Sequence, residues 1–168
     1  KPVHYLCDEH ADWYPSISDI KAKLNDRTRA IIIINPNNPT GAVYDKQILI
    51  ELIEVARANN LIIFSDEIYG KITFDNTPFI PVAALSEDVF TVSFSGLSKT
   101  YKLAGFRCGW MVMSGPKHLA LNYIEGLNIL SNMRLCSNVL AQFAVEPALR
   151  NDSLSQQLTL PNGRLESQ

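Results

Sequence analysis

The fold is decided by residues 30–65, which read AIIIINPNNPTGAVYDKQILIELIEVARANNLIIFS. The two aliphatic runs, at residues 30–34 and 61–64, are typical of strands that a sheet buries on both faces. Between these runs, Asp45 can cap a helix. The expected helix carries an apolar stripe, formed by Ile48, Leu49, Leu52, Ile53 and Ala56. Strand, helix and strand in this order predict a βαβ unit with parallel strands.

The flanking sequence extends this unit in both directions. Further short strands are predicted at residues 3–6, 89–94 and 108–113. Ser16 begins a predicted helix, in which Asp19 completes a capping box. A long helical region is predicted from Pro116 to Pro147, whereas residues 69–88 contain no long helical pattern. The sequence therefore predicts an α/β fold, a three-layer sandwich with a mainly parallel sheet.

The composition makes several classes of protein improbable. The 168 residues are 46% hydrophobic and 19% charged, with a formal net charge of -2. This is enough apolar sequence for a core, and it lacks the basic excess that is typical of nucleic-acid-binding and membrane-surface proteins. No apolar run approaches the roughly 20 residues that a membrane span needs. The first residues have no signal-peptide pattern.

The spacing of the cysteines and histidines favours neither disulfides nor a metal site. The three cysteines lie far apart in apolar surroundings, which favours the reduced thiols of a cytoplasmic protein over disulfides or a zinc site. These residues are Cys7, Cys108 and Cys136. The three histidines have no spacing typical of metal ligands, so we expect no metal site. These residues are His4, His10 and His118.

Polar segments follow three of the predicted strands, at the edge of the sheet where ligands of parallel α/β folds bind. The segments are NPNNPTG at 35–41, SDEIYG at 65–70 and SGLSKT at 95–100. Each has an ordinary structural interpretation, because 35–41 can be a rigid loop, Asp66 a helix cap and Lys99 a solvated surface lysine. Three such segments at successive strand ends favour a shared site instead, with carboxamide, carboxylate, phenol, hydroxyl and amine groups.

A nucleotide-binding function is a possible alternative, because the pair Lys99-Thr100 also ends the phosphate-binding loop of many nucleotide-hydrolysing proteins. That loop requires glycine directly before the lysine and again six positions before it. Ser98 and Ser93 stand at these positions. The sequence therefore does not favour a kinase or an ATPase.

Four short motifs carry a resemblance to a known family. They are NPTG at 38–41, DEIYG at 66–70, SK at 98–99 and GFRCG at 105–109. In order and spacing they resemble the fold-type I, pyridoxal-phosphate-dependent aminotransferases of class I/II. The residues of these motifs are most similar to those of the bacterial alanine (glutamate–pyruvate) aminotransferases. The similarity extends from about residue 3 to residue 149. The resemblance implies the large domain of such an enzyme.

The resemblance implies a role around pyridoxal 5'-phosphate for each polar residue of these motifs. Lys99 would carry the cofactor as an internal Schiff base and, once freed, move a proton between Cα and C4′. Asp66 would pair with the pyridinium nitrogen. Tyr69 and Asn38 would bind the 3′ oxygen of the ring, and Asn38 would also reach the substrate carboxylate. The expected catalytic residues are thus Lys99, Asp66 and Tyr69.

The same resemblance implies a phosphate site. Arg107 matches the phosphate-binding arginine of these enzymes, and a planar guanidinium suits a phosphate dianion. Ser95 and Ser98 can offer hydroxyl groups to the same phosphate. Some relatives place the hydroxyl residue three positions before the lysine, where this chain has Gly96. Ser98 is therefore the preferred phosphate ligand of the two serines.

The reaction implied by the resemblance is transamination, in which L-alanine and 2-oxoglutarate give pyruvate and L-glutamate. Two alternatives stay open: a pyridoxal-phosphate-dependent lyase or decarboxylase, and a non-catalytic truncated remnant. Complete members of the family are more than twice as long and form homodimers. We therefore expect residues 1–150 to be the central part of the cofactor-binding domain, with little activity in isolation, and residues 151–168 to be a polar tail without a folded pattern.

Overall fold

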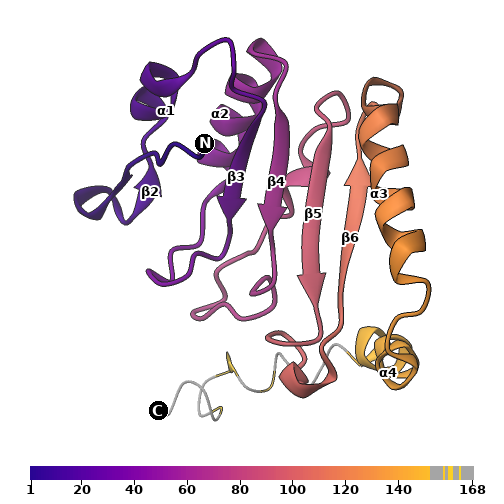
Figure 1. Cartoon of the computed structure of the whole chain (residues 1–168). Helices are drawn as coiled ribbons and strands as arrows, with labels where there is room; N and C mark the ends of the chain where they lie inside the picture. Colours follow the sequence, from indigo (N-terminus) through magenta and orange to yellow (C-terminus); the bar gives the residue numbers. More distant parts are fainter. Residues whose placement is uncertain (152–156, 158, 161–162, 164–168) are drawn as a thin grey trace.

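The structure is a computed structural model that describes residues 1–151, 157, 159, 160 and 163. Its centre is a four-stranded sheet with the order β3-β4-β5-β6. These strands are β3 (Ala30–Ile34), β4 (Ile62–Asp66), β5 (Thr91–Gly96) and β6 (Gly109–Ser114). The first three run parallel, and β6 is antiparallel to β5 (Figure 1). The prediction of a mainly parallel sheet, with a βαβ unit over residues 30–65, is confirmed.

Helices cover both faces of this sheet (Figure 1). Helix α2 (Lys46–Ala58) begins after Asp45, whose side chain accepts a hydrogen bond from the Ile48 amide at 2.9 Å. Its apolar stripe is buried against inward-facing residues of β3 and β4. On the opposite face lies α3 (Leu121–Arg134), where the Tyr123 ring is 6.1 Å from the Phe64 ring, centroid to centroid. These layers form the predicted sandwich.

Strand β3 departs from the predicted burial on both faces. Ile31 and Ile33 are buried on the α2 side, but Ile32 points the other way and is 61% exposed. The apolar cluster on the α3 side is built from residues of β4, β5, β6 and α3 and from Phe90 and Ala120 just before β5 and α3, and it contains none from β3. An aliphatic run alone could not reveal that the second helix stops short of this strand.

The N-terminal segment forms a small two-stranded sheet of β1 (Cys7–Asp8) and β2 (Tyr14–Pro15). Helix α1 (Ile17–Lys23) follows, and its Ile20 belongs to the same buried cluster as α2. The predicted strand at 3–6 is wrong: strand pairing begins only at Cys7, and side chains bind the His4 carbonyl and the Leu6 amide. Lys23 Nζ donates to the His4 carbonyl at 2.9 Å, and Asp19 Oδ2 accepts from the Leu6 amide at 2.8 Å.

Only half of the predicted capping box forms at the start of α1. Ser16 Oγ accepts a hydrogen bond from the Asp19 amide at 3.2 Å, as an N-cap does. The Asp19 carboxylate does not return to the Ser16 amide, because it binds Leu6 and Lys23 instead. The Ser16 amide donates to the Leu6 carbonyl at 2.9 Å.

The C-terminal helical region is divided in two. After α3, residues 135–138 leave the helix, and Leu135 has a φ of 64°. Helix α4 (Val139–Arg150) then continues through Pro147, which the sequence predicted to be its end. Proline lacks its own amide donor but its carbonyl still accepts, and here it accepts from the Asn151 amide at 3.2 Å. Among the described residues, no helix is long and apolar enough to cross a membrane.

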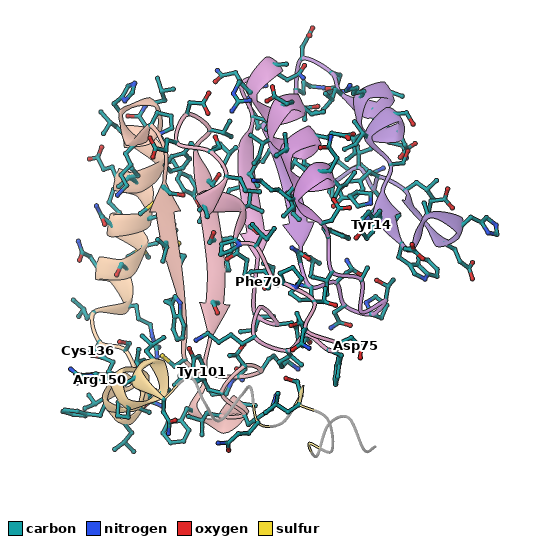
Figure 2. The ribbon with its side chains drawn as sticks, turned by 180° about the vertical axis from the view of Figure 1, so that it is seen from behind. Tyr14, Asp75, Phe79, Tyr101, Cys136 and Arg150 are labelled. Carbon is teal, nitrogen blue, oxygen red and sulfur yellow. The ribbon has the colours of Figure 1, made fainter. Side chains whose placement is uncertain are left out.

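The connection between β4 and β5 contains only one short 3₁₀ turn, η2 (Val82–Ala84), which confirms the absence of a long helix there. Phe79 packs this connection against the chain that leaves β4 (Figure 2). A Cβ atom on Gly70 would lie 2.7 Å from Cε1 of the Phe79 ring. The absence of a side chain at Gly70 thus lets the connection fold back next to the end of β4.

Candidate active site

The carboxyl ends of β3, β4 and β5 lie at one edge of the sheet (Figure 1). Two backbone hydrogen bonds continue the ladder past the strands. The Asn35 amide donates to the Asp66 carbonyl at 3.0 Å, and the Glu67 amide donates to the Phe94 carbonyl at 2.9 Å. The three polar segments therefore leave neighbouring strands side by side, as the sequence predicted.

Three predicted site residues come together at this edge. Asn38 Nδ2 donates a hydrogen bond to the Tyr69 hydroxyl at 3.1 Å. The Lys99 ammonium lies 5.7 Å from the centroid of the Tyr69 ring, within the range of a cation–π contact. Asn38 and Lys99 are exposed, whereas Tyr69 is half-buried. An amide, a phenol and an amine from three different strand ends thus form one cluster that is open to a ligand.

Asp66 is the last residue of β4, between the ends of β3 and β5. Its Oδ1 accepts a hydrogen bond from the Ile68 amide at 3.1 Å, so the residue caps a turn and not a helix. The other carboxylate oxygen, Oδ2, has no hydrogen-bond partner in the described part of the chain. The half-buried carboxyl group is therefore held in place by one oxygen and available through the other.

The hydrogen bonds of the Glu67 side chain were not predicted from the sequence. Its Oε1 accepts hydrogen bonds from Ser65 Oγ at 3.0 Å, the Val82 amide at 3.2 Å and Ser93 Oγ at 3.3 Å. Burial raises the pKa of the Glu67 carboxyl group, and these three donors act in the opposite direction. The available signal was the pair of serines Ser65 and Ser93, which lie in the sheet at neighbouring strands.

The predicted phosphate ligands lie on the connection between β5 and β6 and in the strand before it. Arg107 is exposed, has a φ of 51°, and donates from Nη1 to the Ala104 carbonyl at 2.8 Å. Ser95 and Ser98 are half-buried, and neither hydroxyl forms a hydrogen bond within the described residues. Arg107 and Ser98 lie on the same connection as Lys99 and Ser95 lies in β5, and among the described residues the guanidinium forms no hydrogen bond to either hydroxyl group.

Gly96, three positions before Lys99, allows β5 and β6 to approach each other closely. It pairs with Gly109 across β5 and β6, where the two backbones approach closely. A Cβ atom on Gly96 would lie 2.7 Å from the Cys108 carbonyl oxygen and 3.0 Å from the Gly109 Cα. Both obstacles are backbone atoms, so they cannot turn away as a side chain can.

The substitution Gly96→Ala is therefore expected to lower the free energy of unfolding by about 1–3 kcal/mol, the usual cost of overpacking. Urea denaturation followed by circular dichroism measures the change. Gly126→Ala is the matched control, since a Cβ there meets nothing within 4 Å. In the helix α3 this control should be neutral or stabilising by up to about 1 kcal/mol. Equal stability of the two variants would contradict the close approach of β5 and β6.

Two pockets open near the site residues. The first has a volume of about 410 Å³, and Asn38 and Tyr69 contribute to its wall together with Asp75. The second has a volume of about 480 Å³ and lies between Arg107, Trp110 and helix α4. Asp75 belongs to the chain beyond the end of β4 and lies at the same end of the molecule as Tyr101, which follows Lys99 by two residues (Figure 2). Both pockets are thus at the end where the parallel strands finish.

A mainly parallel α/β sheet with an amide, a phenol and an amine gathered at its carboxyl edge has the arrangement in which proteins of the α/β class bind ligands. The chain belongs to the family described as aminotransferase class I and II, which matches residues 1–166. The resemblance found in the sequence motifs is thereby confirmed.

Curated proteins that are similar to this chain are aminotransferases by name. The chain is 58% identical over 168 residues to the glutamate-pyruvate aminotransferase AlaA of Haemophilus influenzae, and 56% identical to that of Escherichia coli. In both cases the match covers 100% of this chain and 42% of the relative. An alanine aminotransferase of Mycobacterium tuberculosis is 48% identical over 167 residues. The chain therefore spans less than half the length of these relatives.

Solved structures confirm the fold. An aminotransferase from Escherichia coli superposes with a TM-score of 0.97 at 56% identity, over 99% of this chain and 41% of that one. An alanine aminotransferase from Pyrococcus furiosus superposes with a TM-score of 0.85 at 39% identity, over 94% of this chain and 41% of that one. The predicted α/β class is the fold of these aminotransferases.

Proposed function

We propose that this chain forms the cofactor-binding part of an aminotransferase that converts L-alanine and 2-oxoglutarate to pyruvate and L-glutamate. The observation that carries the proposal is the cluster of Asn38, Tyr69 and Lys99 at the carboxyl ends of three adjacent parallel strands. The names of the glutamate-pyruvate and alanine aminotransferases among its relatives support this substrate pair. A homodimer of the complete gene product is part of the same proposal.

The residues at this edge fit pyridoxal 5'-phosphate, the cofactor of fold-type I aminotransferases. Lys99 offers an exposed amine for covalent attachment, and Asp66 Oδ2 can accept a hydrogen bond from a protonated ring nitrogen. Asn38 Nδ2 and the Tyr69 hydroxyl are 3.1 Å apart, so both can bind one oxygen atom on the ring. When bound, the cofactor supplies a ring that draws electrons away from the substrate Cα.

Each residue of the cluster then has a defined task. The Lys99 amine takes the proton from the substrate Cα and returns it during the exchange, as a general acid and base. Asp66 keeps the proton on the ring nitrogen, because a fixed carboxylate favours a positive charge beside it. Tyr69 and Asn38 hold the ring oxygen and so set the orientation of the reacting atoms. Asn38 also binds the substrate carboxylate.

Arg107, Ser95 and Ser98 are the proposed phosphate ligands. Arg107 uses one of its N–H groups on the Ala104 carbonyl, and its guanidinium has further donors for a phosphate oxygen. By the same proposal, residues 1–150 are the central part of the cofactor-binding domain. The proposed polar tail, residues 151–168, lies for the most part outside the described residues.

The proposal is tested by labelling and by product analysis. The protein is mixed with pyridoxal phosphate and reduced with borohydride, and the modified peptide is mapped by mass spectrometry. The complete gene product is then assayed with L-alanine and 2-oxoglutarate. We expect the label on Lys99 and the formation of equal amounts of pyruvate and L-glutamate. A label elsewhere, or the release of ammonia or carbon dioxide in place of L-glutamate, would overturn the proposal.

A further inference from the structure

The carboxylate of Glu67 joins three separate pieces of the chain. One donor, Ser65, belongs to β4; a second, Ser93, belongs to β5; and the third is the backbone amide of Val82, in η2. Ser65 and Ser93 are direct partners in the β4–β5 register. A single oxygen atom, Oε1, accepts all three hydrogen bonds. This group therefore ties the two central strands to the connection between them.

This anchored residue is directly bonded to Asp66 in the chain. Successive residues of a strand point to opposite faces, so Asp66 shares the face of Ile62 and Phe64, whereas Ser65 faces α2. The Glu67 amide is also fixed, by its hydrogen bond to the Phe94 carbonyl at 2.9 Å. With both its amide and its carboxylate held, Glu67 leaves the preceding residue little freedom to rotate about the backbone.

The same anchoring extends to the turn that carries Tyr69. The Glu67 carbonyl accepts a hydrogen bond from the Gly70 amide at 2.9 Å, and the Ile68 amide between them donates to Asp66 Oδ1 at 3.1 Å. Residues 66–70 thus form one hydrogen-bonded turn, in which Asp66 and Glu67 are both half-buried. A disturbance of its carboxylate would reach Asp66 and Tyr69 together.

We propose that Glu67 is a positioning residue: its carboxylate, anchored by Ser65, Ser93 and Val82, sets the orientation in which Asp66 and Tyr69 meet the cofactor ring. The inference rests on the proposed function, because it assigns Asp66 and Tyr69 to that ring. The role needs an acceptor oxygen and not a negative charge. Glutamine, whose Oε1 can accept the same three hydrogen bonds, should therefore replace it, and alanine should not.

The anchoring is tested first in the cofactor-free chain by hydrogen–deuterium exchange. We expect Glu67→Ala to speed the exchange of amides in residues 66–70 about 10-fold or more, with Glu67→Gln close to wild type. Ser93→Ala removes a single donor and should give a smaller increase, which keeps the test available if Glu67→Ala does not fold. Glu87→Ala is the control, since Glu87 is exposed and lies on the same connection. Unchanged exchange in both Glu67→Ala and Ser93→Ala would overturn the anchoring.

The consequence for the cofactor is tested with the loaded, complete gene product. We expect Glu67→Ala to alter the visible absorbance spectrum per bound pyridoxal phosphate and to lower kcat about 10- to 100-fold, the effect of misplacing a catalytic group by about 1 Å. Glu67→Gln should restore both. A variant with faster exchange but a wild-type spectrum and wild-type kcat per bound cofactor would reduce Glu67 to a purely structural residue and overturn the proposal.

The two hypotheses fail in different ways. If the wild-type protein does not attach pyridoxal phosphate at Lys99, the proposed function is wrong, and faster exchange in Glu67→Ala would still show that Glu67 anchors Asp66. If attachment at Lys99 occurs and Glu67→Ala behaves like wild type in both measurements, the proposed function stands and the positioning role is wrong.

Discussion

The substitution Lys99→Ala is expected to abolish covalent attachment of pyridoxal phosphate and to lower kcat by at least about 10³-fold. The large effect arises because a single amine is proposed to hold the cofactor and to transfer the proton at the substrate Cα, and general acid–base catalysis alone contributes about 10²- to 10⁴-fold. Loss of the visible absorbance band of the bound cofactor and a steady-state assay of the complete gene product measure the two effects.

Lys117→Ala is the control for this variant, since Lys117 is exposed and lies in the turn before α3, beyond β6. It should keep both the band and the activity. Lys102 is a sharper comparison for the labelling, because its Nζ lies 3.2 Å from the Lys99 carbonyl on the same connection. Borohydride labelling that moves to Lys102 in wild-type protein, or activity that survives in Lys99→Ala, would refute the assignment.

The substitution Asp66→Asn is expected to lower kcat by roughly 10²- to 10³-fold while cofactor attachment at Lys99 persists. Asparagine keeps the oxygen that accepts from the Ile68 amide, so the turn should survive, but it removes the negative charge that holds a proton on the ring nitrogen. Loss of a preorganised electrostatic partner has effects of this size. Steady-state kinetics and borohydride labelling distinguish the two outcomes.

Asp26→Asn is the matched control, because Asp26 is exposed and lies in a turn before β3. It should leave kcat unchanged. Circular dichroism should show the same folded signal for both variants, since neither replaces a side chain of the apolar core. Transamination at the wild-type rate by Asp66→Asn would contradict the role of its charge.

Much of the fold could be predicted from local patterns. Asp45 and the apolar stripe of α2 define that helix, and the aliphatic runs on either side of it define β3 and β4. The strands at 89–94 and 108–113 were placed within two residues of β5 and β6. The errors lie where long-range contacts decide the result. Ile32 is exposed because the apolar cluster under α3 contains no residue of β3.

The candidate site, like the fold, could be predicted only in part. Order and spacing of the motifs were sufficient to predict that Asn38, Tyr69 and Lys99 gather at one edge, since parallel strands finish at the same side. The anchoring of Glu67 was not predictable, because it depends on the register that places Ser65 opposite Ser93 and on a connection that returns Val82 to the strand end. The register of the strands and the path of the connection depend on the packing of the whole domain.

The parallel pairing of β3, β4 and β5 also sets a length scale for what the edge can hold. Neighbouring strands are about 4.8 Å apart, so the first and third of three consecutive strands are separated by about 10 Å. By the proposed function, groups on the two outer strands would reach opposite sides of one flat ring, and Asp66, on the middle strand, would face the ring between them. The distance between the strand ends at this edge is thus set by the spacing of hydrogen-bonded backbones.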